Sequence, residues 1–291
     1  MGIFGETVNG IHEKMTGPYD DLYVYYLNGV VDDGDSEKLG ESFLGNWVED
    51  DSSFLFFSKK SDETITELLK RDPGLRLFDT YYFTYEQWYG RKKSTLRIDR
   101  FVITPPWAEA EVAKGDIRIV LDPGVVFGDG FHPTTYSCLR SMLYLRDIAP
   151  FDRVMDIGTG TGILAISAAA LGAERVLALD LNPLAVKTAL RNVKLNGFDR
   201  VIEVVKGRAE NFNLSGDLTI ANIHYEVLRH LFEREKFLEN KWFIVSGLMR
   251  SQASEFRDRI KGRGLEVDRE WDHEMTWYTF LLKNKKKRLK A

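Results

Sequence analysis

The chain has 291 residues, which at about 150 residues per domain leaves room for two domains. Hydrophobic residues make up 44% and charged residues 29%, values of a globular protein that exclude a disordered or collagen-like one. Forty basic residues against forty-four acidic ones give a net charge of −4, which excludes a chain-wide basic surface for nucleic acid but leaves room for a local patch. One cysteine, Cys138, excludes an intrachain disulfide and a cysteine-based zinc site.

Two further absences concern membranes and secretion. No apolar run approaches the ~18 residues needed to cross a bilayer. The first residues, MGIFGETVNGIHEK, lack the basic-then-apolar block of a secretory signal. We therefore expect a cytoplasmic protein that does not contact membranes.

Residues 1–85 predict a small N-terminal α+β domain. Strand-like and helix-like patterns alternate there, which favours an open sheet with helices on one face. The predicted elements are strands at 22–31 and 53–57, a weakly patterned helix at 36–47, and a helix at 65–70 that a Pro-Gly turn closes.

Residues 86–115 are predicted to be a linker, because 87–107 mix basic residues, Pro and Trp. Residues 116–291 then form a second domain in which strands and helical patterns alternate. Such alternation predicts a doubly wound, mostly parallel sheet with helices on both faces. The expected strands are 118–121, 153–157, 175–180, 201–205, 218–222 and 242–247, and the expected helices are 133–145, 162–170, 183–196, 226–237 and 251–261.

The strongest motif is a glycine-rich turn between a strand and a helix, in which Asp156 is followed by Gly158, Gly160 and Gly162. Such a turn lets a ligand approach the backbone at the carboxyl end of a strand. A dinucleotide fingerprint would need its third glycine at Ile163, and Asp156 would repel a phosphate. S-adenosylmethionine, which carries an ammonium and a sulfonium but no phosphate, suits the turn better.

Asp180 ends the next strand, 22 residues after Gly158. A carboxylate at this point can accept hydrogen bonds from both ribose hydroxyls of a nucleoside. The alternative interpretation is an N-cap for the helix that begins near Pro183. The correct spacing of the glycine turn and this acid on consecutive strands favours the methyl-donor site.

Two flanking segments are expected to complete the site. Thr134 and Thr135 begin a helix after a turn-rich stretch, and Asn222 ends a strand that faces the same crevice. Asn222 can accept a hydrogen bond from an incoming amine and align it for attack. For both segments the alternative is ordinary helix capping. His132 has no nearby cluster of metal ligands, so we predict a hydrogen-bonding role for it and no metal site.

Three segments together resemble the PrmA family of ribosomal-protein L-11 methyltransferases: DPG-x-x-FG-x-G-x-HPTT, D-x-G-x-G-x-GILAI-x-A-x-x-LGA and ANI. The resemblance extends over residues 86–282. It implies a Rossmann-like class I methyltransferase domain behind a small substrate-recognition domain, S-adenosylmethionine as methyl donor, and transfer to lysine and N-terminal amines of L-11 or a similar protein. The residues expected to bind the donor are Phe127, Thr135, Asp156, Gly158, Gly160, Gly162, Asp180 and Asn222, and Asn222 is also the expected catalytic residue.

The chain departs from the family pattern at the expected entrance for the acceptor. Asp129 and Phe131 stand where the family has threonines, and residues 224–226 replace small ones. The mechanism that we expect is an in-line displacement in which Asn222 and nearby backbone carbonyls orient the amine, without a metal or a dedicated general base.

Other classes of protein remain open at this point. A nucleic-acid base methyltransferase would stack a flipped base on an aromatic such as Tyr225, although Ile223 and His224 stand where that class usually carries prolines. A non-catalytic donor-binding module associated with the ribosome is suggested by the basic tail at 283–290, although a solvated chain end explains this tail better. A dehydrogenase is disfavoured by Ile163 and Asp156.

Overall fold

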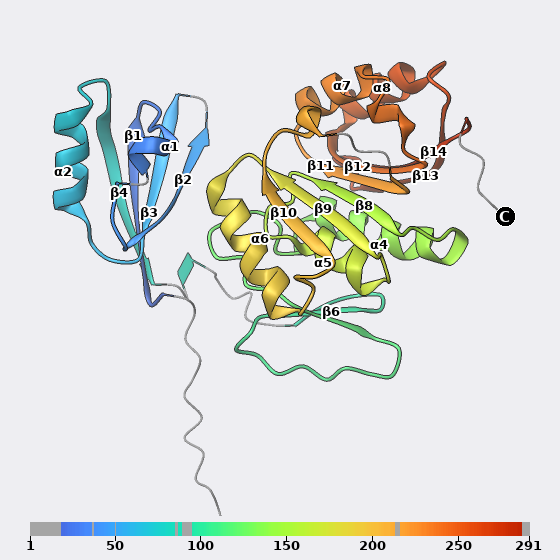
Figure 1. The fold of residues 1–291 in the computed structure, drawn as a ribbon, viewed down its shortest axis with the longest axis horizontal. Helices are drawn as coiled ribbons and strands as arrows, with labels where there is room; N and C mark the ends of the chain where they lie inside the picture. The colour runs from blue at the N-terminus through green and yellow to red at the C-terminus, as the bar shows by residue number, and fades with distance from the viewer. Residues whose placement is uncertain are drawn as a thin grey trace, which may run out of the picture.

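The computed structural model describes residues 19–36, 38–49, 51–84, 87–88, 95–212 and 216–286. Two units lie side by side, a small N-terminal one and a larger one built on a seven-stranded sheet (Figure 1). No helix among these residues is both long and apolar enough to span a bilayer.

The N-terminal unit is a four-stranded antiparallel sheet with one long helix on one face. The predicted α+β unit is thus confirmed. Its helix packs on the sheet through Ile65 and Leu68, which are buried against Tyr25 and Phe57. In chain order its elements are β1 (Asp21–Asn28), α1 (Asp33–Ser36), β2 (Phe43–Glu49), β3 (Ser52–Phe57), α2 (Asp62–Arg71) and β4 (Arg76–Thr84).

The helix predicted at 36–47 is wrong, because the segment from Phe43 onward forms β2. Phe43 stands opposite Phe57 and Trp47 opposite Phe54 on β3. Aromatic cross-strand pairs of this kind stabilise a sheet, whereas Gly45 in the middle of the segment disfavours a helix. Tertiary pairing therefore overrides the weak helical spacing.

A three-stranded sheet precedes the glycine turn and consists of β5 (Leu96–Ile98), β6 (Phe101–Thr104) and β7 (Ile117–Val120). The strand predicted at 118–121 exists, but it pairs with β6 in this sheet and not with the main one. The segment expected as a linker thus contains two strands. Asn196 fastens this layer to the larger unit, since its side chain accepts from the Val120 N–H at 2.9 Å and donates to the Val120 carbonyl at 2.7 Å.

The main sheet has the strand order β10-β9-β8-β11-β12-β14-β13. The first five strands are parallel, whereas β14 is antiparallel to both of its neighbours. The predicted mostly parallel sheet is confirmed, and the last two strands were not predicted. The strands are β8 (Arg153–Ile157), β9 (Arg175–Asp180), β10 (Ile202–Lys206), β11 (Leu218–Asn222), β12 (Trp242–Met249), β13 (Leu265–His273) and β14 (Trp277–Asn284).

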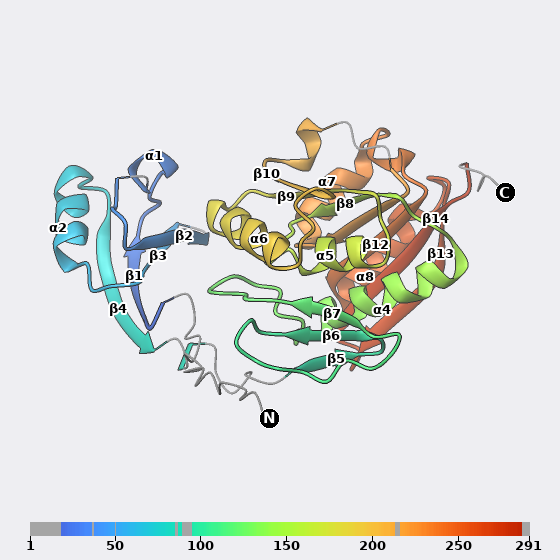
Figure 2. The same ribbon diagram turned by 60° about the horizontal axis from the view of Figure 1, so that its bottom comes forward.

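Helices cover both faces of this sheet, as predicted (Figure 2). On one face α4 (Pro133–Ile148), α5 (Ile163–Ala170) and α6 (Pro183–Leu195) enclose a core that includes Cys138 and Ile220, and on the other α7 (Tyr225–Glu233) and α8 (Arg250–Ile260) enclose a cluster of phenylalanines. The helix predicted at 226–237 ends at Glu233 and is followed by the short turn Phe237–Glu239. The order of the strands reverses between β8 and β11, and open α/β sheets bind ligands at that switch point.

The small unit packs on the larger one beside the switch point. Leu22, Val24 and Phe56 from the helix-free face of its sheet are buried against Leu184 and Ala185 at the start of α6. The approach is close, because a Cβ atom on Gly45 would lie 2.7 Å from the Cβ of Leu184. The small unit is therefore placed near the glycine turn by direct packing.

Candidate active site

The glycine turn is enclosed by two other loops at the carboxyl end of β8. Gly158 and Gly160 have φ angles of +68° and +56°, in the region that glycine alone adopts freely. A Cβ on Gly158 would lie 2.3 Å from Ile223 Cγ2, and one on Gly160 would lie 2.6 Å from the Phe127 carbonyl oxygen. Both glycines are therefore required by space as well as by backbone conformation.

The turn-rich loop before α4 is hydrogen-bonded onto the glycine turn. Thr161 Oγ1 donates to the Gly128 carbonyl at 2.6 Å, and the Thr161 N–H donates to the Phe127 carbonyl at 3.3 Å. The Asn192 side chain on α6 donates to the carbonyls of both Asp122 and Thr161. This network holds Phe127 at the turn with half of its surface, 50%, exposed.

Asp156 is buried directly beneath the turn, with 1% of its surface exposed. Its Oδ2 accepts from Thr159 Oγ1 at 2.6 Å and from the Ala165 N–H at 3.2 Å, and no described residue donates to its buried Oδ1. Burial raises the pKa of this carboxyl to about 7. The negative charge of Asp180 also raises this pKa, whereas the two hydrogen bonds lower it. The acid thus fixes the turn and retains an unfilled acceptor.

Asp180 lies at the end of β9 and contacts the turn directly. Its Oδ2 accepts from the Gly160 N–H and its Oδ1 from the Asn182 N–H, both at 2.9 Å. Burial raises the pKa of the Asp180 carboxyl, whereas these backbone hydrogen bonds lower it. The helix-cap interpretation is wrong, because Asn182 is the N-cap of α6 and accepts from the Leu184 N–H. The Leu181 N–H also donates to this carboxylate, and since a carboxylate has about four acceptor positions it can still accept from a further donor.

Thr135 and Asn222, 87 residues apart in the chain, meet at the site. Asn222 Nδ2 lies 3.5 Å from Thr135 Oγ1. Neither is a helix cap, since His132 caps α4 and His224 is the N-cap of α7. The structure therefore brings together all eight residues predicted for the donor site, through contacts that run from Phe127 and Asp180 to the turn and from the turn to the Asn222 loop.

A row of aromatic rings borders the site and includes one residue that sequence analysis missed. The His132 ring centroid lies 5.0 Å from that of Phe127 and 5.3 Å from that of Trp277 at the start of β14. The His132 ring also accepts from the Thr134 N–H, which confirms its hydrogen-bonding role. Trp277 carries no local motif, and only the pairing of β14 with β12 brings it here.

Within the described ranges, no group of three or more His, Cys, Asp or Glu side chains is arranged to hold a metal ion. The site is thus made of backbone amides, two acids, a carboxamide, hydroxyls and aromatic rings. A mostly parallel sheet, helices on both faces and a glycine turn at the switch point define a Rossmann-like domain with a ligand site at that switch point.

The chain belongs to the PrmA family, whose model, described as ribosomal protein L11 methyltransferase, matches residues 60–285. It is 37% identical over 189 residues to the ribosomal protein L11 methyltransferase of Anoxybacillus flavithermus, an alignment that covers 64% of this chain and 60% of the relative. The protein of the same name from Halalkalibacterium halodurans is 33% identical over 238 residues, covering 76% of this chain and 75% of that protein.

Among solved structures, the chain is similar to the ribosomal protein L11 methylase of Lactobacillus delbrueckii subsp. bulgaricus. The TM-score is 0.58 at 28% identity, and the match covers 66% of this chain and 98% of that one. The chain matches 60% or less of the length of the first curated relatives. The family resemblance drawn from the three sequence motifs is confirmed.

Proposed function

We propose that the protein transfers methyl groups from S-adenosylmethionine to amines of ribosomal protein L11 or of a protein similar to it. The observation that carries this proposal is the convergence of Asp180, Thr135 and Asn222 on the glycine turn at the strand switch point. Membership of the PrmA family supports the same activity.

The residues present fit the proposed donor. Asp180 retains acceptor capacity for ribose hydroxyls, and Gly158 and Gly160 carry no side chain that could hinder the approach of a ligand to the turn. The Oδ1 atom of Asp156 accepts no hydrogen bond from the described residues, and it adds negative potential beneath the turn when that carboxyl is ionised. When bound, S-adenosylmethionine supplies a methyl group on a cationic sulfonium, which is a good leaving group.

Asn222 is the proposed positioning and catalytic residue on the acceptor side. Its Nδ2 faces Thr135 Oγ1, so its carboxamide oxygen is the atom left to accept a hydrogen bond from an incoming amine. A lysine amine has a pKa near ~10.4 in water and must lose a proton before it attacks. Phe127 and Trp277 surround the entry with apolar surface, which favours the neutral amine.

Methylation of a nucleic-acid base is the weaker candidate. That reaction needs an exposed aromatic beside the asparagine on which a flipped base stacks. Tyr225 is only 4% exposed and lies inside the phenylalanine-rich core. A ribosome-associated module without catalysis is kept as an outcome of the experiment.

The test incubates the protein with methyl-labelled S-adenosylmethionine and ribosomal subunits from cells that lack the modification. We expect label on one small protein that comigrates with L11, and loss of that label with Asn222→Ala while binding of S-adenosylhomocysteine persists. Label on RNA would refute the protein acceptor, and binding without any label would refute catalysis. Indifference to S-adenosylhomocysteine combined with tight NADH binding would refute the donor itself.

A further inference from the structure

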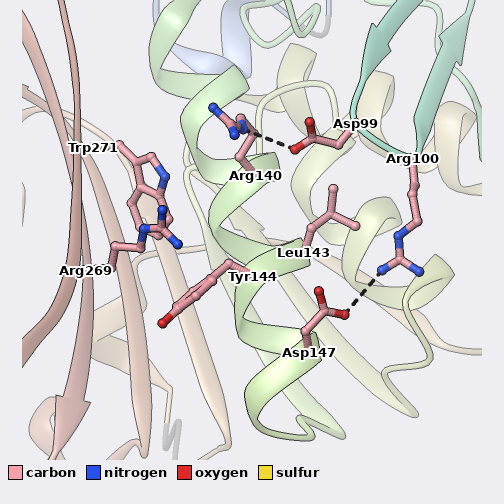
Figure 3. A pocket seen from close by; sticks show the side chains of 8 residues that line it. All are labelled: Asp99, Arg100, Arg140, Leu143, Tyr144, Asp147, Arg269 and Trp271. Atoms are coloured by element: carbon pink, nitrogen blue, oxygen red, sulfur yellow. Dashed lines mark hydrogen bonds and ion pairs between the residues drawn. The ribbon is translucent and has the colours of Figure 1, made fainter.

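A separate cavity lies across the far half of α4, away from the glycine turn. It has a volume of about 320 Å³, and none of its lining residues belongs to the proposed donor site. Figure 3 shows α4 between strand β13 on one side and the β5–β6 turn on the other. The lining residues are Asp99 and Arg100 from that turn, Arg140, Leu143, Tyr144 and Asp147 from α4, and Arg269 and Trp271 from β13.

The cavity has an excess of positive charge in a chain that is acidic overall. Three arginines face two aspartates there, whereas the net charge of the chain is −4. Arg140 Nε donates to Asp99 at 3.1 Å, and Arg100 lies 3.7 Å from Asp147. The two arginine side chains are 45% and 50% exposed. Each guanidinium has five N–H donors, so these pairs leave several directed outward.

Arg269 differs from the other two arginines in what holds it. Its guanidinium carbon lies 4.6 Å from the Tyr144 ring centroid and 5.3 Å from that of Trp271, and the two rings are 6.1 Å apart (Figure 3). The ion pairs found in the described part of the chain include none to Arg269. Stacking on rings orients a guanidinium without neutralising it, and its N–H edge remains available for an oxyanion.

We propose that this cavity binds one nucleotide unit, with the phosphate on Arg140 and Arg100 and the base against Trp271 and Arg269. Arginine forks fit phosphate oxygens, and aromatic and guanidinium faces stack bases regardless of their sequence. An acidic peptide would satisfy the arginines but would make no use of the flat surfaces of Trp271 and of the Arg269 guanidinium. The same chemistry can come from a free mononucleotide or from single-stranded RNA, and the experiment separates these sources.

The test measures binding of AMP and of a ten-nucleotide single-stranded RNA to the full chain by calorimetry at low salt. Arg269→Gln and Arg140→Gln are each expected to weaken binding about tenfold, as for the loss of a charged hydrogen bond. Arg140→Gln is also expected to lower the salt dependence for RNA by about one phosphate contact, whereas Arg269→Gln, which removes a contact to the base, is not. RNA that binds more tightly than AMP indicates a strand, and equal affinities indicate a free nucleotide.

The matched control is Arg257→Gln, because Arg257 stacks on Tyr278 and Phe280 at 5.5 and 5.3 Å, outside the cavity. Its RNA affinity should stay within about twofold of the parent. Arg269→Lys, which keeps the charge but loses the planar stack, should fall between the parent and Arg269→Gln. Unchanged thermal unfolding and unchanged methyl transfer in these variants separate the cavity from the fold and from the proposed activity.

Three results would overturn the proposal. The first is that neither AMP nor RNA binds the parent protein. The second is that RNA affinity survives Arg269→Gln but is lost when the basic residues 287–290 are removed, which would place binding on the tail. The third is that an oligo-glutamate peptide of matched charge competes as well as RNA does, which would make the occupant a peptide.

Discussion

The buried carboxyl of Asp156 predicts an unusual dependence of stability on pH. Because burial raises its pKa from 3.8 in the unfolded chain to about 7 in the fold, the folded protein binds more protons than the unfolded one between these two values. Stability must therefore fall as pH rises through this window. Below this pH window the Asp156 carboxyl is protonated in both the folded and the unfolded state and does not change the free energy of unfolding. Above the window the carboxyl is ionised in both states, and the full loss of stability has been reached.

The size of the effect follows from the shift of about 3 units. At about 1.4 kcal/mol per unit, the full cost is on the order of 4 kcal/mol, of which about 2.5 kcal/mol falls between pH 5 and pH 8. Asp156→Asn preserves the shape and one oxygen that can accept from Thr159 and Ala165, but it cannot ionise. The variant should lack this part of the pH dependence.

The assay is urea unfolding of the parent and of Asp156→Asn at pH 5 and at pH 8. Subtracting the two pH differences cancels the titrating groups that do not interact with Asp156, and we expect the parent to lose about 2.5 kcal/mol more than the variant. Parallel pH profiles would show that the carboxyl is ionised at little cost in the fold, and the argument from burial would fail. A saturating cationic donor should shrink the difference, because positive charge favours the ionised form.

Three other substitutions test the packing of the site. Gly158→Ala should lower the free energy of unfolding in urea by at least about 2 kcal/mol, because a Cβ collides with the neighbouring loop. The same variant should lose calorimetric binding of S-adenosylhomocysteine, and retained binding would contradict this prediction. Asn222→Ala should lower methyl transfer about 100-fold with little change in donor affinity, and near-normal turnover would remove it from the mechanism. Gly45→Val should lower the unfolding temperature through its clash with Leu184, whereas Gly34→Val, with no atom within 4 Å of its Cβ, should not; equal effects would refute the interface argument.

Local spacing was enough to predict which residues meet at the glycine turn. The glycine turn, Asp180 and Asn222 each follow a buried parallel strand, and the carboxyl ends of such strands meet at one edge. Once the strands are recognised, these residues have to lie together. Whether Asp180 and Asn222 are helix caps could not be decided in this way, because capping and ligand binding favour the same residue types at the same place.

The errors came from segments whose conformation depends on distant partners. β2 has a weak helical pattern and is a strand because Phe43 and Trp47 pair with β3. β13 is a largely exposed edge strand that reads as polar, so its sequence shows no buried face. β14 was missed with it, and Trp277 was therefore missed as well. The role of β7 depended on its pairing with β6, which no local pattern indicates.

The two halves of the site are thus built in different ways, with consequences for how they vary. The donor half is held by contacts between neighbouring strand ends, and a change in Gly158 or Gly160 meets backbone or packed side chains within 3 Å. The proposed acceptor half is bordered by the loop before α4 and by β14, which are joined by the ring contacts of His132. Phe131 and His224, which the sequence resemblance predicts to depart from the family pattern, lie near this half. Substitution of the exposed His224 should cost little packing, so we expect that under the proposed function the choice of acceptor can change while the donor site stays the same.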